Sequence, residues 1–533
     1  MHLDWLDGAI VAAYLAGITA TGLLASRRQT ETSARYFLAG RALGWPTIGL
    51  ALFATNISTV HLIGLASSGF SDGLVIGNFE WLAPFLLIVL GLVFAPFYFR
   101  SRVSTLPEYL EGRYGPGART FLAFMAVVGA LFIHIGVTLY AGAVMFKSFV
   151  DLPIVWSILI VSVLTILYTA LGGLRAVVVT EAIQAVLLIA GALAVTAFGI
   201  AALADAGFES LADVRAAARP GQVSMIRTDG EFAWWIMLLG YPVIGIWYWC
   251  SDQTIVQRVL GARSERDAQL GPLFAGFIKI LPVFVMVFPG IIGYLLFKDV
   301  LLENPDQTLV VLIQKLLPAG LRGLVIAGLL AALMSTVAGA LNSTATLVSI
   351  DIVKRLRPGT PDRALVRIGQ LTAVIVMLCA MAWSTQGERF GGIFKGINQM
   401  IAVLAPPISA VFVLGIFWRR GTARAALATL AAGFVLGAAV FVLDFPAFGL
   451  RLVTDKLGIP FMLQAFLLFA ASSAIFVGVS LASPPPDQAR VARYCWKSPL
   501  AVITEKPPAG LGDPRVIAAL LIAVVVVCYC LFA

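Results

Sequence analysis

The stretch Ala54-Thr55-Asn56-Ile57-Ser58-Thr59-Val60-His61 places polar side chains in the middle of a long hydrophobic run. That run covers 45–67, which is about the length of ~20 residues that a helix needs to cross a bilayer. Threonine, serine, asparagine and β-branched residues are unfavourable in a helix interior, where polar side chains compete for backbone hydrogen bonds. We therefore expect this helix to unwind near Ala54 and Ile57 and to present its carbonyl groups to an ion.

Hydrophobic runs of similar length recur along the whole chain. The 533 residues are 60% hydrophobic and 12% charged, with a mean hydropathy of +0.94, whereas globular domains have about 25% charged residues. The sequence therefore predicts an all-α integral membrane protein, organised as a single transmembrane domain over 1–533. About fourteen spans are predicted, at 7–25, 45–67, 74–97, 121–146, 153–171, 177–204, 232–257, 270–297, 321–348, 366–383, 393–417, 425–442, 459–481 and 516–532.

Arginine and lysine gather in every second loop. The net charge of +9 invites a nucleic-acid partner, but this distribution follows membrane topology, because basic loops stay on the cytoplasmic side. We therefore expect a multi-pass protein of the cell (inner) membrane with both termini outside, and no nucleic-acid partner. The sequence has no Walker A loop, which argues against ATP-driven transport. The basic loops lie at 27–41, 100–119, 175, 258–266, 354–367, 419–424 and 490–515.

A second hydrophobic run is also interrupted. The run 232–257 carries Gly240, Pro242 and Gly245 ahead of Trp247-Tyr248-Trp249-Cys250, and proline removes a backbone donor from a helix. The two interrupted runs are five spans apart, the spacing of corresponding helices in inverted five-helix repeats. We expect repeats at about 45–204 and 232–417, although two such helices also arise by chance. The extra helices would then be 7–25, 425–442, 459–481 and 516–532.

A group of small residues offers oxygen ligands in the ninth span. Ala332, Ser335 and Thr336 stand at i, i+3 and i+4 and therefore share one helix face. Neutral oxygens suit a monovalent hard cation, whereas calcium sites use carboxylates. The structural alternative is that these hydroxyls bond their own helix backbone or pack against a neighbouring helix.

Ionisable and aromatic side chains within the spans predict a site for a polyhydroxylated solute. A sugar requires hydrogen-bond partners around its edge and an aromatic plate against one face, and ionisable groups at membrane depth usually serve function. The alternatives are that Glu80 and Lys279 form a structural ion pair and that the aromatic residues are interfacial anchors. The candidates are Asn56, His61, Glu80, Tyr248, Trp249, Lys279 and Asn398.

Two further polar residues are interpreted as structural. His134 in the fourth span is expected to be a hydrogen-bonded core histidine, and Asp252 lies toward the cytoplasmic end of the seventh span. No nucleophile–base–acid set or metal cluster appears at membrane depth, so an enzyme is not predicted.

Several motifs, in order along the chain, resemble those of the sodium/solute symporter family and its sodium–glucose cotransporter branch. The resemblance implies a leucine-transporter-type fold with discontinuous helices, co-transport of sodium and import of a sugar by alternating access. The motifs are Tyr36-Phe37-Leu38-Ala39-Gly40-Arg41, Asn56-Ile57-Ser58-Thr59-Val60-His61-Leu62-Ile63-Gly64, Phe79-Glu80-Trp81, Gly172-Gly173-Leu174, Trp247-Tyr248-Trp249-Cys250-Ser251-Asp252-Gln253, Ile255-Val256-Gln257-Arg258, Ile278-Lys279-Ile280-Leu281-Pro282, Leu341-Asn342-Ser343-Thr344-Ala345-Thr346 and Asp351-Ile352.

The resemblance also implies roles for individual residues. Sodium would be held by the carbonyls of Ala54, Ile57 and Ala332 and the hydroxyls of Ser335 and Thr336. Sugar hydroxyls would be bound by Asn56, His61, Glu80, Lys279 and Asn398, with Tyr248 stacking as the inner gate beside Trp249, and with Leu65, Phe79 and Phe394 closing the outer side.

The sequence departs from the family pattern at two positions. Some sugar transporters of the family carry Asn at the position of Gly245 and Gln at that of Asn398, and both changes enlarge the pocket. The sequence therefore leaves both a hexose and a larger or differently decorated sugar as candidate solutes. Another solute, such as a polyol, an amino acid or a carboxylate, is a further alternative, and a sodium-binding sugar sensor without coupled flux is a third.

The expected stoichiometry is one sodium per solute. Relatives that move two ions use an acid in the sixth span with hydroxyl residues just after the first ion pair. Here the acid is Glu181, and Val337, Ala338 and Gly339 follow Thr336 without any side-chain oxygen. Glu181 is therefore assigned an electrostatic or ion-exit role.

Overall fold

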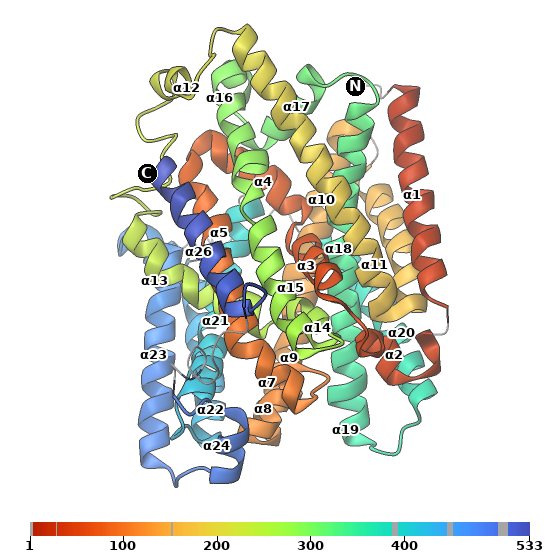
Figure 1. The fold of residues 1–533 in the computed structure, drawn as a ribbon, viewed down its shortest axis with the longest axis vertical. Coiled ribbons are helices and arrows are strands. Elements are labelled where there is room, and N and C mark those ends of the chain that lie inside the picture. Colours follow the sequence, from red (N-terminus) through yellow and green to blue (C-terminus); the bar gives the residue numbers. More distant parts are fainter. Residues whose placement is uncertain are drawn as a thin grey trace.

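The computed structural model is a bundle of long helices packed side by side (Figure 1). It describes residues 4–27, 29–150, 153–385, 393–444, 451–498, 501 and 510–533. Within these ranges the backbone is helix or irregular, apart from an isolated β-bridge between Leu43 and Ala262. Helices satisfy their own backbone hydrogen bonds, which is the requirement for crossing lipid. The predicted all-α class is confirmed.

The elements of the first half follow one another with short connections. They are α1 (Trp5–Ala25), η1 (Gln29–Glu31), α2 (Ser33–Leu38), η2 (Ala39–Arg41), α3 (Trp45–Asn56), α4 (Thr59–Ser71), η3 (Leu74–Gly77), α5 (Asn78–Trp81), α6 (Ala83–Ile88), η4 (Val89–Phe94), α7 (Ala95–Ser101), α8 (Leu106–Tyr114), α9 (Pro116–Gly129), η5 (Ala130–Val137), α10 (Thr138–Val150), α11 (Ile154–Asp205), α12 (Leu211–Ala217), α13 (Trp234–Gly245), η6 (Ile246–Ser251) and α14 (Gln253–Leu260).

The second half continues in the same way. Its elements are α15 (Glu265–Ile278), η7 (Val283–Val287), α16 (Phe288–Leu301), η8 (Pro305–Gln307), α17 (Thr308–Leu316), α18 (Leu321–Thr346), η9 (Leu347–Val353), α19 (Lys354–Leu356), α20 (Asp362–Ser384), α21 (Ile393–Phe417), α22 (Ala423–Asp444), η12 (Leu452–Lys456), α23 (Phe461–Ala482), α24 (Gln488–Tyr494) and α26 (Pro514–Leu531).

The described helices supply eleven candidate membrane spans, or twelve if the bent pair α3 and α4 counts as one span. The predicted count of fourteen is not reached and stays a prediction. Two predicted spans, 153–171 and 177–204, lie within the single element α11, and 232–257 is divided among α13, η6 and α14.

Gly173 explains why two predicted spans appear as one element. Its φ of 56° and ψ of −155° break the helical geometry inside α11, and glycine adopts positive φ without steric cost. A Cβ atom at this position would lie 2.3 Å from the Tyr36 carbonyl oxygen of α2. The chain therefore turns at Gly173 with α2 packed directly against the turn.

Helix α18 lies at the centre of the bundle. It packs against α11, α1, α3 and α20, and nearly all of its residues are buried. Its sequence is rich in Gly, Ala, Ser and Thr, the small residues that let membrane helices approach closely. This close packing brings the predicted ion-binding residues of the ninth span against α3.

The two ends of the bundle differ in character. The short helices α2, α8, α19 and α24 lie toward the lower end of the view, whereas α12 and both chain termini lie in its upper half (Figure 1). The lower elements carry basic residues such as Arg35, Arg113, Arg355 and Arg493. Residues from four of the basic loops recognised in the sequence thus lie at this end of the molecule, called here the basic end.

Candidate functional site

The first interrupted helix breaks where the sequence predicts. Helix α3 ends at Asn56, Ile57 and Ser58 have extended backbones with ψ of 100° and 173°, and α4 begins at Thr59 with a bend of 62°. Ser58 and His61 form a reciprocal cap at the start of α4, with His61 Nδ1 3.3 Å from the Ser58 amide nitrogen. Carbonyls at the end of a helix have no partner within that helix, so the break leaves oxygen atoms at the middle of the bundle.

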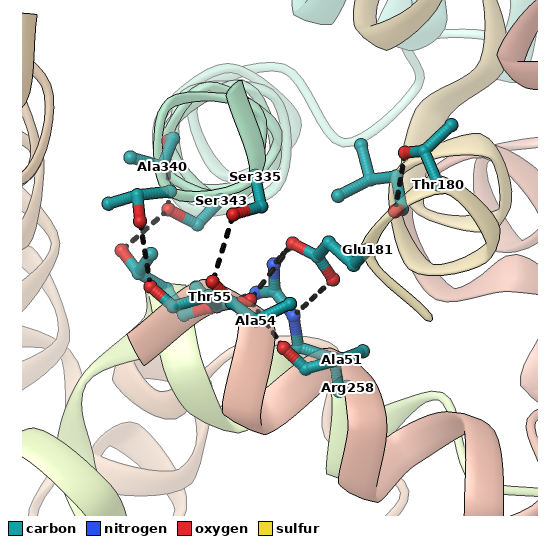
Figure 2. Close-up of polar contacts among 12 residues, drawn as sticks. Ala51, Ala54, Thr55, Thr180, Glu181, Arg258, Ser335, Ala340 and Ser343 are labelled. Atoms are coloured by element: carbon teal, nitrogen blue, oxygen red, sulfur yellow. Dashed lines mark hydrogen bonds and ion pairs between the residues drawn. The ribbon is translucent and has the colours of Figure 1, made fainter. Parts of the chain in front are cut away.

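Helix α18 places its hydroxyl residues against those carbonyls. Ser335 Oγ lies 2.9 Å from the Ala54 carbonyl oxygen and 3.0 Å from that of Ala332. Thr336 Oγ1 donates to the Thr55 carbonyl oxygen at 3.0 Å. Figure 2 shows Ser335 directed at Ala54 across the space between the two helices. Ile57, the remaining predicted ligand, is buried in the break itself.

The carbonyls of Ala54, Thr55 and Ala332 and the hydroxyls of Ser335 and Thr336 are called here the oxygen cluster. Glu181 lies next to this cluster, but its carboxylate already has other partners. Its Oε1 accepts a hydrogen bond from Thr55 Oγ1 at 2.9 Å, and Arg258 forms a salt bridge with both of its oxygens, the Nε contact measuring 3.2 Å. Both charged side chains are fully buried, and Arg258 also donates to the Thr254 carbonyl. The pair is labelled in Figure 2 beside Thr55.

Arg258 corrects the assignment of the basic loops. The sequence predicts it as a cytoplasmic loop cation, whereas it lies in α14 and reaches the buried Glu181. Gly339 on α18 makes room for it, because a Cβ at Gly339 would lie 2.4 Å from an Arg258 guanidinium nitrogen. Glu181 itself could have indicated this inward position of Arg258 from the sequence, because a carboxylate at membrane depth requires a counter-charge.

The predicted solute-binding residues surround one cavity, called here the central cavity. Its empty space is about 790 Å³, a figure that includes the part open to solvent. All seven predicted residues line it, and so do residues that the sequence analysis did not select. The predicted ones are Asn56, His61, Glu80, Tyr248, Trp249, Lys279 and Asn398; the unselected ones include Ser58, His134, Thr138, Tyr241, Ile244 and Ile401.

A polar network runs along one wall of the central cavity. Lys279 is paired with Glu80, and its Nζ donates to Asn56 Oδ1 at 2.6 Å. Asn56 Nδ2 in turn donates to the Tyr248 hydroxyl at 3.1 Å. Four residues from four separate segments, α3, α5, η6 and the end of α15, are therefore linked, and every one of them faces the cavity.

Aromatic rings complete the wall. Tyr248 and Trp249 meet edge to face with ring centroids 5.1 Å apart, and Lys279 Nζ lies 5.7 Å from the Trp249 ring centroid. A cation within about 6 Å of an aromatic ring is attracted to its face. The rings and the polar network thus form a surface with both an apolar plate and hydrogen-bonding groups.

The residues predicted as gates lie in different environments. Phe79 lines the central cavity and packs against Phe232, Tyr241 and Phe461. Tyr248 lines it as well. Leu65 is fully buried in α4 and is absent from the lining of the cavity among the described residues. The side chain of Phe394 lies outside the described residues.

The second interrupted helix breaks later than the sequence predicts. Helix α13 continues through Pro242 and Gly245, passes into the π-helical segment η6, and the break falls at Asp252 with ψ of 124°. Neighbouring groups hold α13 in place, because Tyr241 donates to the Phe79 carbonyl and Ser409 donates to the Val243 carbonyl. These contacts tie α13 to neighbouring segments on both sides of Pro242.

His134 and Asp252 are paired with each other. His134 Nε2 lies 2.6 Å from Asp252 Oδ2, and Asp252 also caps α14 by accepting from the Thr254 amide. The expected structural roles are therefore present. However, His134 also faces the central cavity, a position that its sequence context does not indicate.

The comparisons with known proteins agree with this geometry. A sodium/mannose cotransporter of Bos taurus is 35% identical and is covered over 92% of its length by 96% of this chain. The human sodium/myo-inositol cotransporter is 35% identical, with 94% of this chain and 77% of the relative covered. A solved structure of a Na⁺-coupled sialic acid symporter, 21% identical, matches with a TM-score of 0.79 over 91% of this chain and 99% of that one, which confirms the fold.

The family model covers most of the chain. The model described as the sodium:solute symporter family matches residues 36–433, a range that contains the α3–α4 break, the central cavity and the α18 hydroxyl residues. The sodium-coupled, multi-pass transporter expected from the sequence is thereby supported at the level of the family. This chain belongs to the sodium:solute symporter family.

Proposed function

We propose that this protein is a sodium-coupled symporter that imports a neutral sugar or a closely related polyol by alternating access. The observation that carries the proposal is Thr336, whose hydroxyl bonds the Thr55 carbonyl while its side chain lines the central cavity beside Asn56. A single helix turn therefore joins the oxygen cluster to the solute cavity. The named substrates of the two relatives, mannose and myo-inositol, are consistent with a polyhydroxylated solute.

We assign sodium to the oxygen cluster. Its ligands would be the carbonyls of Ala54, Ile57 and Ala332 and the hydroxyls of Ser335 and Thr336. Neutral oxygens from two helices suit sodium, and binding it would draw the α3–α4 break against α18. Because the same break carries Asn56 and His61, ion binding would arrange the solute site.

We assign the solute to the polar and aromatic wall of the central cavity. Asn56, His61, Glu80, Lys279 and Asn398 would bind hydroxyl groups, and the Tyr248 ring would cover one face of the solute beside Trp249. An anionic solute is disfavoured because the Lys279 ammonium is already matched by the Glu80 carboxylate. A second carboxylate would leave one negative charge uncompensated in a buried site, which is costly.

The gate assignments belong to the same proposal. Tyr248 would close the central cavity toward the basic end, and Leu65, Phe79 and Phe394 would close it on the opposite side. We further propose that the two inverted repeats cover about 45–204 and 232–417 within one domain, and that the basic end faces the cytoplasm of a cell (inner) membrane with both termini outside. The gathering of basic residues at one end supports this orientation.

Uptake by the purified protein in proteoliposomes tests the function. Mannose, glucose, myo-inositol and an amino acid would be offered as radiolabelled solutes, with and without an inward sodium gradient. Sodium-dependent accumulation of a sugar or polyol is the expected result. Accumulation of the amino acid alone would replace the solute assignment, and binding without counterflow exchange would indicate a sensor that does not transport.

A further inference from the structure

A second cavity lies next to the central one and shares a wall with it. Its empty space is about 390 Å³ including the part open to solvent, and its lining is mainly apolar, with Leu122 of α9, Leu404 of α21 and Phe434 of α22. His134 borders both cavities. Asp252, which is paired with His134, lines the second cavity together with Ser251 and Trp247. The wall between the two cavities therefore includes the His134–Asp252 pair.

The pair joins two structural units that are separate in the chain. His134 belongs to η5, whereas Asp252 stands at the break between η6 and α14. The contact of 2.6 Å is buried, with about 7% and 8% of the two side chains exposed. The His134 ring also lies 6.0 Å from the ring of Tyr248, the residue assigned to close the solute site. The pair thus connects the break of the second interrupted helix to the neighbouring η5.

The second cavity lies toward the basic end. Helix α9 begins at Pro116, directly after the basic segment that contains Arg100 and Arg113, and continues into η5. Leu122, which lines the second cavity, therefore lies nearer to that basic segment than His134 does. Helix α22 likewise begins at Ala423 just after Arg419 and Arg420. The second cavity is therefore placed between the central cavity and the basic end.

We propose that the His134–Asp252 pair is a latch that closes the central cavity toward the basic end, and that the second cavity is the compartment which the solute enters when the pair parts. This inference rests on the proposed transport function. His134 acts here as a positioning residue, because it holds Asp252 and the start of α14 in place beside Tyr248. The apolar lining of the second cavity offers few hydrogen bonds to a sugar, so the solute would pass through it and not be retained.

The latch is tested by the accessibility of a cysteine inside the central cavity. The reporter is Ile401→Cys, placed in a chain whose Cys379, Cys528 and Cys530 are replaced by Ser, and the rate of reaction with a small membrane-impermeant thiol reagent is measured from the side of the basic end. Sodium is present and no solute is added. We expect Asp252→Asn to raise the rate about tenfold, because it removes a charge-assisted hydrogen bond. The rate from the opposite side should not rise.

Asp444→Asn is the matched control, because Asp444 is as buried as Asp252 and also holds several hydrogen bonds, but it lies at the end of α22. If Asp252→Asn does not fold, His134→Gln tests the same contact, with a smaller rise of about threefold since a weaker hydrogen bond remains. Unchanged rates in the folded variant, or an equal rise in Asp444→Asn, would overturn the latch. Because no solute is used, this outcome is distinguishable from a failure of sodium-driven uptake in the unmodified protein.

Discussion

Replacing Arg258 by glutamine would free the carboxylate of Glu181, which is bound to Arg258 in the structure. Arg258 contacts both oxygens of Glu181, and Thr55 donates to one of them. A sodium ion at Glu181 would have to displace the guanidinium group from a fully buried pair. Breaking such a pair costs about 3–5 kcal/mol, which weakens binding of a second sodium by about 10²-fold to several thousandfold. We therefore expect one sodium ion per solute in the unmodified protein.

The stoichiometry sets how strongly the solute is concentrated. One sodium ion moving down ~100 mV contributes about 2.3 kcal/mol, and a tenfold sodium gradient adds about 1.4 kcal/mol. Together these amounts correspond to an accumulation on the order of 500-fold with one ion. Two ions would square this ratio. The reversal potential of solute-dependent current in proteoliposomes separates the two cases directly.

The Arg258→Gln variant tests whether Arg258 is what prevents binding of a second sodium ion. With the guanidinium removed, Glu181 and the Thr55 hydroxyl would be available to a cation, so the coupling ratio should rise from one toward two. The double variant Glu181→Gln, Arg258→Gln is the control, because it has no carboxylate to neutralise and should stay at one. A ratio of two in the unmodified protein, or no difference between the single and double variants, would refute the argument.

Substitutions at Thr336, Glu80 and Tyr248 address the remaining assignments. Thr336→Ala should raise the sodium concentration for half-maximal uptake about fivefold, because one oxygen ligand is lost. Thr344→Ala removes a buried hydroxyl that is bonded only within α18 and should leave that concentration unchanged. Equal effects of the two substitutions would count against the ion site. Glu80→Ala should weaken sugar binding at least about tenfold, measured by equilibrium binding, and normal binding with a lower unfolding temperature would favour a purely structural pair with Lys279. Tyr248→Phe should keep most uptake, because it loses only the bond from Asn56, while Tyr248→Ala should lose it; similar activities would remove Tyr248 as a gate.

Local composition was enough to predict the features that depend on local physics. The membrane class follows from hydrophobic runs of spanning length, since the bilayer acts on each segment separately. The break at Ile57 and Ser58 follows from neighbouring residues that are all poor in a helix interior. Polar residues such as Glu80 and Lys279 were recognisable because any ionisable group at that depth is costly, and they do line one cavity.

The tertiary structure decided which distant groups meet. Arg258 and Glu181 are 77 positions apart, and whether an arginine at a predicted span end stays in the loop or turns inward depends on the gap that Gly339 leaves in another helix. The second interrupted helix continues through Pro242 and breaks at Asp252, where the start of α14 is held by a contact with His134 of η5. These outcomes depend on packing between helices, and the sequence of one segment contains no information on the partners that the fold brings beside it.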